Sequence, residues 1–549
     1  MTREPALSVE RLTFRYHSRT EPAVIDVGFD LQPGELLLMA GASGCGKTTI
    51  ARCVNGLIPR SYKGERQGSV RLNGREVADL PLAEVAQIVG TLLQDPERQI
   101  VNSSVMGELA FGPENLGLPP GEIRRRIEEV IERLGIVDLR DRQTFTLSGG
   151  EKQKVALAGI LVMQPSILVL DEPLASLDPA SAHEALAIFR RLADEGASIL
   201  LIEHRVEEAL RARPDRLLYL REGRIEYLGP VRELLTAIDH REVKLPAPWV
   251  VQRVRAEAAL RRPAPPGPPA AAGEPLVVFE NVSFGYGEGP TVLHEIDLTI
   301  RRGDQIAILG PNAAGKSTLV KHAIGLLKPR QGRVLIGDLD SRRQSVAQIA
   351  RTVGYVFQSP THMLFAPTVL EELAFGPRNL GFEAAALEAS LQSSIAATNL
   401  AGLEQYPPLG LSFGQQKRTT IAAVAAMRSR ILIMDEPTAG QDYANFTRFM
   451  DALCAPADAG GTSVLGTTFD ATLFITHDLD LAVTYASRVV LLSQGRIVGD
   501  GPPEQVLADF DRLERCRILP TSLLRLNCEM LDRTGRFLPA EALAAYPAA

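Results

Sequence analysis

The sequence is poor in the features that mark secreted, membrane-spanning and zinc-binding proteins. Its 549 residues include five cysteines at irregular spacing, and its eight histidines show no paired Cys/His spacing of a zinc site. No apolar run approaches the roughly 20 residues that cross a bilayer, and the opening MTREPALSVE lacks the apolar core of a signal peptide. A net charge of −7 disfavours a nucleic-acid-coating protein. These absences predict a reducing, cytoplasmic compartment and no nucleic-acid partner.

The chain repeats itself. It is too long for one hydrophobic core, and ordinary domain sizes predict about two to four domains. The block ELAFGP-x-NLG occurs at 108–117 and again at 372–381, an offset of 264 (372 − 108). The same offset separates three further pairs, namely Gln94 and Gln358, Ser148 and Ser412, and Asp171 and Asp435. A constant register over this length indicates two copies of one domain.

The segment between the copies is rich in proline and alanine. Residues 262–273 read RPAPPGPPAAAG, a composition that favours an extended, exposed linker. We therefore place the first domain at 1–245, the linker at 246–274 and the second domain at 275–520. The remaining 521–549 is a C-terminal appendage to which the sequence assigns no role.

Each copy contains a phosphate-binding loop in its N-terminal part. The apolar run 36–40 predicts a buried parallel strand, and the pattern G-x-x-x-x-G-K-[ST] follows it and leads into helix formers. Glycines let backbone N–H groups point at a phosphate, the lysine reaches the β- and γ-phosphates, and the hydroxyl of Thr48 or Ser317 ligates Mg²⁺. The predicted ATP-binding residues are Gly41, Ser43, Gly44, Cys45, Gly46, Lys47, Thr48 and Thr49, and Gly310, Asn312, Ala313, Ala314, Gly315, Lys316, Ser317 and Thr318.

An Asp-Glu pair ends a second apolar strand in each copy. The run 167–170 delivers Asp171 and Glu172 at its carboxyl end, where α/β sheets bind ligands. Asp171 suits contact with Mg²⁺, and Glu172 suits polarising an attacking water. Asp435 and Glu436 repeat the pair. The alternative is an acidic pair that only satisfies backbone N–H groups at a helix start.

Together these motifs resemble the ATP-binding-cassette ATPases. The resemblance rests on both phosphate loops, the LSGG segment at 147–150, the strand ending in Asp-Glu, and a histidine after the next strand, and it covers essentially all of both copies. It implies an ATPase that uses ATP and Mg²⁺. The implied fold is α/β: two tandem P-loop NTPase domains, each with a RecA-like core, an antiparallel β subdomain and a helical subdomain.

The resemblance also assigns roles to individual residues. Tyr16 and Tyr286 would stack on adenine, and His204 and His477 would contact the γ-phosphate. Gln94 and Gln358 would sense Mg²⁺ and the membrane partner. In an internal pseudo-dimer, each signature segment would bind the γ-phosphate held by the opposite phosphate loop; its residues are Ser148, Gly149, Gly150, Ser412, Gly414 and Gln415. The loops 176–178 and 440–442 would cross to the opposite domain.

The copies depart from the family pattern in different ways. Glu151 stands in the first signature where Gln is usual, Phe413 replaces a glycine in the second, and Ala313 replaces a glycine in the second phosphate loop. Both copies keep the lysine, Asp-Glu pair and histidine. We therefore expect two ATP-hydrolysing sites of unequal affinity or rate. Extra residues between Asp435 and His477, around 456–468, predict a loop of no assigned role.

The ELAFGP-x-NLG blocks resemble the ATPases of energy-coupling-factor (ECF) importers of vitamins and metals. The resemblance implies a transmembrane coupling (T) subunit facing this region, with Glu108 and Glu372 near its basic residues, a separate substrate-binding membrane (S) component, and a place at the cytoplasmic face of the cell membrane. Two alternatives stay open. A tandem sugar-importer ATPase would not be expected to repeat ELAFGP, and a soluble ribosome-acting tandem ATPase usually has a long charged linker. The sequence does not name the cargo.

Overall fold

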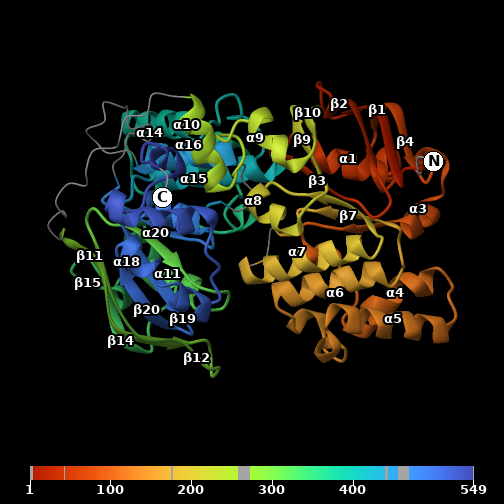
Figure 1. The fold of residues 1–549 in the computed structure, drawn as a ribbon. Coiled ribbons are helices and arrows are strands. Elements are labelled where there is room, and N and C mark those ends of the chain that lie inside the picture. Colours follow the sequence, from red (N-terminus) through yellow and green to blue (C-terminus); the bar gives the residue numbers. More distant parts are fainter. Residues whose placement is uncertain are drawn as a thin grey trace. The chain divides into compact units, whose positions relative to one another are not determined.

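Two six-stranded sheets, one in each half of the chain, form the centres of the fold (Figure 1). The computed structural model describes residues 4–42, 44–174, 177, 179–257, 273–438, 443–454 and 469–547. They divide into two units, Met1–Leu245 and Pro246–Ala549. Within the described residues, no helix has both the length and the apolar character to cross a bilayer.

The first unit contains a four-stranded and a six-stranded sheet, in the orders β2-β1-β4-β5 and β10-β9-β3-β8-β7-β6. The strands are β1 (Leu7–Tyr16), β2 (Val24–Leu31), β3 (Leu36–Gly41), β4 (Gly64–Leu72), β5 (Arg75–Glu76), β6 (Val89–Leu92), β7 (Ile167–Asp171), β8 (Ser198–Ile202), β9 (Arg216–Arg221) and β10 (Arg224–Gly229). The α-helices are α1 (Lys47–Val54), α2 (Leu57–Arg60), α3 (Leu82–Ile88), α4 (Val105–Asn115), α5 (Pro120–Leu134), α6 (Gly149–Leu161), α7 (Pro179–Asp194), α8 (Val206–Ala209) and α9 (Leu234–Ala237).

Hydrophobic patterning accounts for these layers. β3, β7 and β8 are buried along their whole length, as expected of central parallel strands, whereas β1 alternates buried and less buried residues. In Figure 1 the antiparallel strands β1, β2 and β4 and the helices α4–α6 lie on opposite sides of the parallel strands β3 and β7. The apolar face predicted for α5 is confirmed, because Ile123, Ile127, Val130, Ile131 and Leu134 are its buried residues. The predicted core, antiparallel and helical parts are thus all present.

The second unit repeats the topology, with sheet orders β12-β11-β14-β15 and β16-β17-β18-β13-β19-β20. Its strands are β11 (Pro275–Gly285), β12 (Thr291–Arg301), β13 (Gln305–Leu309), β14 (Gln331–Ile336), β15 (Leu339–Asp340), β16 (Val353–Val356), β17 (Ile431–Asp435), β18 (Ala471–Ile475), β19 (Arg488–Ser493) and β20 (Arg496–Gly501). Its α-helices are α10 (Ala247–Glu257), α11 (Lys316–Ala323), α12 (Val346–Ile349), α13 (Val369–Asn379), α14 (Ala384–Ala397), α15 (Phe413–Ala426), α16 (Tyr443–Cys454), α17 (Leu479–Tyr485), α18 (Pro503–Val506), α19 (Phe510–Arg515), α20 (Ser522–Thr534) and α21 (Ala540–Leu543).

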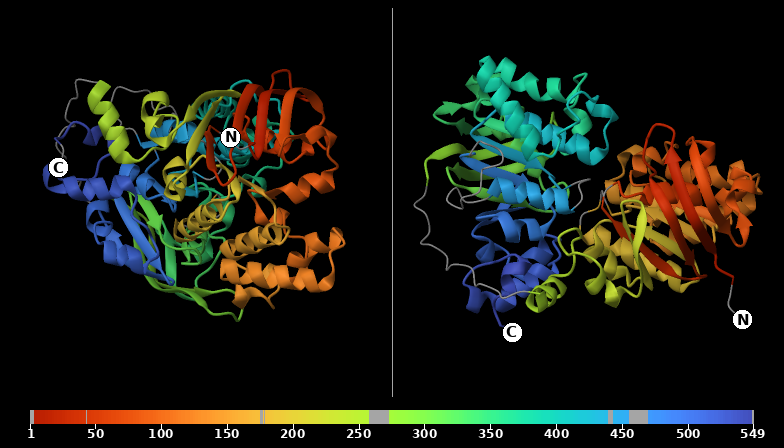
Figure 2. Two further views of the ribbon diagram at one scale, coloured as in Figure 1. Left: turned by 45° about the vertical axis from the view of Figure 1, so that its right-hand side comes forward. Right: turned by 90° about the horizontal axis from the view of Figure 1, so that it is seen from above.

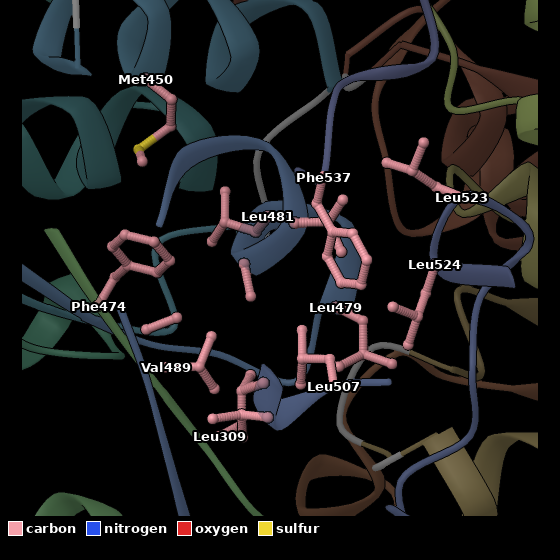
Figure 3. Close-up of a cluster of buried hydrophobic side chains, with 14 of the residues drawn as sticks. Leu309, Met450, Phe474, Leu479, Leu481, Val489, Leu507, Leu523, Leu524 and Phe537 are labelled. Atoms are coloured by element: carbon pink, nitrogen blue, oxygen red, sulfur yellow. The ribbon is translucent and has the colours of Figure 1, made fainter. Parts of the chain in front are cut away.

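The C-terminal residues belong to the core of the second unit. Figure 3 shows Leu523, Leu524 and Phe537 packed in one cluster with Leu479 and Phe474. α10 lies beside the C-terminal helices (Figure 2, right). Its first N–H, at Ala247, donates to Ser522 Oγ at 2.8 Å. The residues 521–549 therefore complete a hydrophobic core, which the sequence pattern alone did not reveal.

The predicted extended linker 246–274 needs a correction at its beginning. Residues 247–257 form α10, with Ala247, Val250 and Val251 buried. The reason is tertiary packing, since the apolar residues of this short helix find their partners in α20 and α21, nearly 300 residues downstream. The proline-rich residues 258–272 lie outside the described part of the chain, as does the predicted loop 456–468.

Candidate active sites

Each phosphate loop joins the end of a central strand to a helix. In the first unit the loop runs from β3 into α1, and Gly46 takes φ +112°, where an added Cβ would lie 2.6 Å from the carbonyl oxygen of Ala23. Only glycine fits this combination. Lys47 is buried, and its Nζ donates to the carbonyl oxygens of Gly41 and Ala42, both at 2.8 Å. The loop thus holds an ammonium group at the N-terminus of a helix, an arrangement suited to phosphate.

The second loop, from β13 into α11, has the same geometry. Lys316 Nζ donates to Gly310 O at 2.7 Å and to Pro311 O at 2.8 Å. Ala313 takes φ +61°, a left-handed conformation in which a non-glycine residue costs about 1–2 kcal/mol. The predicted departure at Ala313 therefore has a physical consequence, namely a strained loop. The predicted residue Ser43 of the first loop lies outside the described residues.

The Asp-Glu pair of the first unit lies next to its phosphate loop. Thr48 Oγ1 donates to Asp171 Oδ1 at 3.5 Å, so the two oxygens lie close enough that both would help to hold one Mg²⁺ ion. Burial, and then the charge of Glu172, raise the pKa of Asp171 to about 6. A divalent cation would favour the ionised carboxylate. In the second unit Asp435 Oδ2 accepts a hydrogen bond from Tyr355 at 2.8 Å.

Three predicted catalytic residues of the first unit meet. Gln94 Nε2 donates to Glu172 Oε2 at 2.7 Å, and His204 Nδ1 lies 3.7 Å from the same oxygen. Burial, the first of several causes, lowers the pKa of His204, which favours the neutral imidazole at pH 7. In the second unit His477 Nε2 lies 3.1 Å from Glu436 Oε1. Both glutamates take positive φ, +50° at Glu172 and +46° at Glu436, and such strain often occurs at functional sites.

The comparisons with known proteins agree with this geometry. The family model described as ABC transporter matches residues 24–175 and 293–439, which together exceed half of the chain. The chain belongs to the ABC transporter family. A protein of Methanosarcina acetivorans that carries the name of an ABC transporter ATP-binding protein is 35% identical over 96% of this chain and 90% of its own length. The two ABC domains of the chain are therefore ATPase domains that bind ATP.

Two solved structures are also similar to this ABC ATPase, one over less than half of the chain and the other over most of it. The structure of cbiO1 from Clostridium perfringens, described as part of the ABC transporter complex cbiONQ, is 31% identical and covers 44% of this chain and 94% of its own, with a TM-score of 0.38. The archaeal ribosome recycling factor aABCE1, solved with the ribosomal stalk protein aP1, is 20% identical over 91% of this chain and 92% of its own, with a TM-score of 0.58. At that identity, the second likeness shows the fold alone.

The signature segments of this ABC ATPase begin helices α6 and α15. Ser148 accepts the N–H of Glu151 at 3.4 Å, and the Glu151 carboxylate accepts the N–H of Ser148 at 2.7 Å. Ser412 and Gln415 form the same capping box in the second unit. Glutamate therefore replaces glutamine in the first signature without losing the cap. Phe413 is the first residue of α15 in helical backbone, so its position does not require glycine, and its side chain is outside the described part.

Some predicted contacts of the ABC ATPase stay predictions. Gly149, Gly150 and Gly414 begin the signature helices, but the opposite phosphate loops that they would face belong to the other unit. The expected crossing loops 176–178 and 440–442 lie outside the described residues, except for Leu177. Tyr16 and Tyr286 are positioned by hydrogen bonds between their hydroxyls and Thr49 Oγ1 (3.1 Å) and Thr318 Oγ1 (3.2 Å). Adenine stacking by these rings is compatible with that position.

The expectation for Glu108 and Glu372 is wrong. Both side chains are buried rather than presented to a partner, with exposed fractions of 8% and 5%. Glu108 Oε2 accepts the N–H groups of Val101 and Asn102 at 2.9 and 2.8 Å, and Glu372 Oε2 accepts those of Phe365 and Ala366 at the same distances. A carboxylate with two backbone donors is satisfied internally. Each glutamate therefore fixes the loop that precedes its own helix.

Sequence reasoning missed two buried ionisable residues beside the catalytic groups. Glu203 precedes His204 and is fully buried; its carboxylate accepts the N–H groups of Leu174 at 2.9 Å and of His204 at 3.2 Å. Burial, and then the charge of Glu172, raise its pKa to about 8. The other residue is Lys417 of α15. The signal was available in the repeat, because the second unit has Thr476 where the first has Glu203, and the first has Gln153 where the second has Lys417.

Proposed function

We propose that the chain is the fused ATPase pair of an ECF-type importer for a vitamin or metal micronutrient. It would lie at the cytoplasmic face of the cell membrane, bound to a separate transmembrane coupling (T) subunit that works with a membrane substrate-binding (S) component. ATP hydrolysis by its two ABC domains would move these partners. The observation that carries the proposal is an exposed apolar loop next to the Gln-containing loop, built in the same way in both units.

The repeated surface consists of one loop residue and one helix residue in each unit. Val101 and Phe365 are 63% and 61% exposed, and Phe111 and Phe375 are 48% and 52% exposed. In the second unit the Phe365 and Phe375 rings pack edge to face with centroids 4.8 Å apart. Large apolar side chains that gather at the surface mark sites of interaction. We call these four residues the apolar docking residues.

Buried glutamates fix the loops that carry this surface. Glu108 and Glu372 each bind two consecutive N–H groups at the exposed loop residue, with the same distances in both copies. A loop held by a buried carboxylate presents its apolar side chain at little further cost in conformational entropy. Its position a few residues after Gln94 and Gln358 would let a bound membrane partner sense the nucleotide site.

The same residues would carry out the ATPase chemistry in each unit. Lys47 and Lys316 bind phosphate oxygens, and Thr48 with Asp171, and Ser317 with Asp435, would hold Mg²⁺, which neutralises charge on the phosphates when bound. Glu172 and Glu436 would orient and polarise the attacking water. Gln94 holds the Glu172 carboxylate by its hydrogen bond, so a movement of the Gln-containing loop reaches that carboxylate directly.

Purification from detergent-solubilised membranes tests the proposal. We expect the wild-type chain to co-purify in fixed stoichiometry with an integral membrane protein, and a variant with V101S, F111S, F365S and F375S to lose that partner while its basal ATPase activity stays within about twofold. A control variant with V137S and L339S, which changes two residues each 58% exposed elsewhere, should keep the partner. Co-purification with ribosomal particles instead of a membrane protein would overturn the proposal.

The cargo is tested in the same preparation. Proteoliposomes that contain the complex should take up one vitamin or metal ion in an ATP-dependent manner, and uptake should fail with the variant that lacks the apolar docking residues. ATP-dependent sugar uptake would instead show the alternative importer class.

A further inference from the structure

Lys417 is a fully buried lysine with a saturated set of hydrogen bonds. Its Nζ donates to the carbonyl oxygens of Phe357 at 2.8 Å, Gln358 at 2.9 Å and Asp435 at 3.2 Å. An ammonium group has three N–H donors and a neutral amine has two, so three carbonyl acceptors select the charged form. Burial lowers the pKa of Lys417 to about 8, and the nearby charges of Asp435 and Glu436 oppose that shift.

These three acceptors belong to two functional elements, and Lys417 itself belongs to a third. Phe357 and Gln358 form the Gln-containing loop after β16. Asp435 ends β17 and precedes the glutamate predicted to activate water. Lys417 lies in α15, whose N-terminus carries the signature serine Ser412. One buried cation therefore connects the signature helix, the Gln-containing loop and the carboxylate strand of the second unit.

The first unit connects the same elements differently. Gln153 occupies the position of Lys417, and its Nε2 donates to the carbonyl oxygen of Pro173, beyond the Asp171-Glu172 pair. Helix α6 reaches the loop after Gln94 through an ion pair between Lys152 and Glu97 at 2.5 Å, in which Glu97 is 69% exposed. Lys152 is 17% exposed, and an ion pair with one partner as exposed to solvent as Glu97 contributes little because water screens it. Among the residues that the structure describes, the buried link between signature helix and Gln-containing loop is thus made by Lys417 alone.

We propose that Lys417 is a positioning residue that couples the signature helix of the second unit to its Gln358 loop and its Asp435-Glu436 strand end. A buried ammonium cannot leave its carbonyl acceptors without a large desolvation penalty. A shift of α15 therefore carries the backbone of Gln358 with it, whereas the hydrogen bond that Gln153 donates goes to Pro173 and not to the Gln94-containing loop. The second ATPase centre responds to the position of its own signature helix, and the first centre does so much less.

The inference rests on the ATPase activity and on the catalytic roles of Glu172 and Glu436, and it is independent of the proposed import function. The rate of ATP hydrolysis by the double variant E172Q/E436Q tests the catalytic roles of the two glutamates separately from the presence of ATPase activity. If that variant keeps ATPase turnover, the glutamate roles are wrong. If it is inactive, each single variant keeps one active centre. E172Q then measures the second centre alone, and E436Q measures the first centre alone.

The first test measures the Gln-containing loops without nucleotide. Hydrogen exchange of the amides at 357–364 should become about tenfold faster or more in K417Q, which gives the second unit the residue of the first. The matched control Q153M should leave the amides at 93–100 within about twofold of the wild type. Unchanged exchange at 357–364 in K417Q would overturn the proposal, since a link without effect on the loop positions nothing.

The second test measures turnover of the second centre. In the E172Q background, K417Q should lower kcat by about tenfold to a hundredfold through misplacement of the reacting groups, with the KM for ATP changed less than about threefold. In the E436Q background, Q153M should leave kcat within about twofold. A parallel loss of kcat and ATP binding in K417Q would indicate a purely structural role and would contradict the proposal.

A reciprocal variant decides the matter if K417Q does not fold. Q153K places a lysine beside the Gln-containing loop of the first unit, and in the E436Q background it should slow hydrogen exchange at 93–100 by about threefold or more. Exchange that stays at the wild-type rate in folded Q153K would overturn the proposed coupling.

Discussion

Gln94 Nε2 and Glu172 Oε2 are joined by a hydrogen bond of 2.7 Å, so the loop predicted to sense Mg²⁺ holds the carboxylate predicted to polarise water. In the second unit Glu436 lies 3.1 Å from Nε2 of His477. In the first unit it is Nδ1 of His204 that faces Glu172. The two centres also differ in their buried ionisable groups: the first has Glu203, whose raised pKa of about 8 favours the neutral carboxyl at pH 7, and the second has Lys417. Centres with the same catalytic residues and different surroundings should differ in rate.

The first prediction concerns that inequality. E172Q and E436Q should each reduce steady-state ATPase activity, and by amounts that differ by about threefold or more, because the carboxylates have different partners and different nearby charges. The double variant E172Q/E436Q should lose at least about a hundredfold of the activity, since each general base is then absent. Equal losses from the two single variants would contradict unequal sites. Wild-type binding of a fluorescent ATP analogue in all three variants is the control for folding.

The second prediction concerns Glu203 and pH. Its pKa is raised from 4.5 to about 8 in the folded chain, so the folded state holds this proton more tightly than the unfolded state does. Raising the pH from about 4.5 to 8 therefore lowers the free energy of unfolding. Glutamine does not titrate and keeps an oxygen that can accept the N–H groups of Leu174 and His204. At pH 9, E203Q should be more stable than the wild type by at least about 1 kcal/mol, or about 2–4 °C in Tm.

The pH dependence itself is the control for Glu203. At pH 4 the carboxyl is largely protonated in both the folded and the unfolded chain, so E203Q and the wild type should melt within about 1 °C of each other. The difference in Tm should grow between about pH 4.5 and 8 and level off above pH 8, as measured by differential scanning fluorimetry. A difference of the same size at pH 4 and pH 9 would mean that packing, and not the carboxyl charge, distinguishes the two proteins.

Much of the fold and the site could be predicted because those features are local or periodic. The apolar face of α5, the buried strand before Gly41 and the loop glycines each follow from a few neighbouring residues. The repeat then transfers these assignments to the second copy, at an offset of 264 for Gln94, Ser148 and Asp171 and of 269 (316 − 47) for the lysine of the phosphate loop. The Thr48–Asp171 and Gln94–Glu172 pairs were predicted as members of one site, and the structure brings them together.

The features that sequence reasoning missed depend on contacts between distant residues. A glutamate in the first turn of a helix can face solvent or reach back to a loop, and only the packed structure shows that Glu108 binds the N–H of Val101. Lysine is almost never fully buried, so nothing in the signature helix indicated the three acceptors of Lys417. The apolar residues of α10 follow a proline and precede a proline-rich run, and their partners lie at the far end of the chain.

The third prediction concerns Glu372, the buried glutamate that binds the loop carrying Phe365. E372A should destabilise the chain by about 1–3 kcal/mol, because the N–H groups of Phe365 and Ala366 lose their acceptor. The neighbouring E371A is the matched control, since Glu371 is exposed in the same helical turn and should change stability by less than about 0.5 kcal/mol. Urea unfolding of both variants measures the difference. Equal effects would contradict the role assigned to Glu372.

E372A should also weaken binding of the proposed membrane partner. Released from Glu372, the loop would have to be ordered again on binding, which costs affinity even though Phe365 is retained. Pull-down of the partner from detergent extract by E372A and E371A, at a temperature where both variants are folded, tests this. Full binding by E372A would show that the glutamate stabilises the fold without preparing the surface.

The last prediction concerns Asn527, which ties the C-terminal residues to the second unit. Its side chain is fully buried and makes three hydrogen bonds, from Leu538 N at 2.7 Å, to Leu538 O at 2.9 Å and to Leu523 O at 3.0 Å. N527L removes these bonds and strands the Leu538 amide in an apolar core, so it should destabilise the second unit by about 2–4 kcal/mol. E529A, at an exposed position of the same helix, should cost less than about 0.5 kcal/mol. Because α20 and α10 share one core, limited proteolysis of N527L should also expose cleavage sites at 247–257. A variant that melts near the wild-type temperature, with α10 still protected, would show that Asn527 does not tie the C-terminal residues to the second unit.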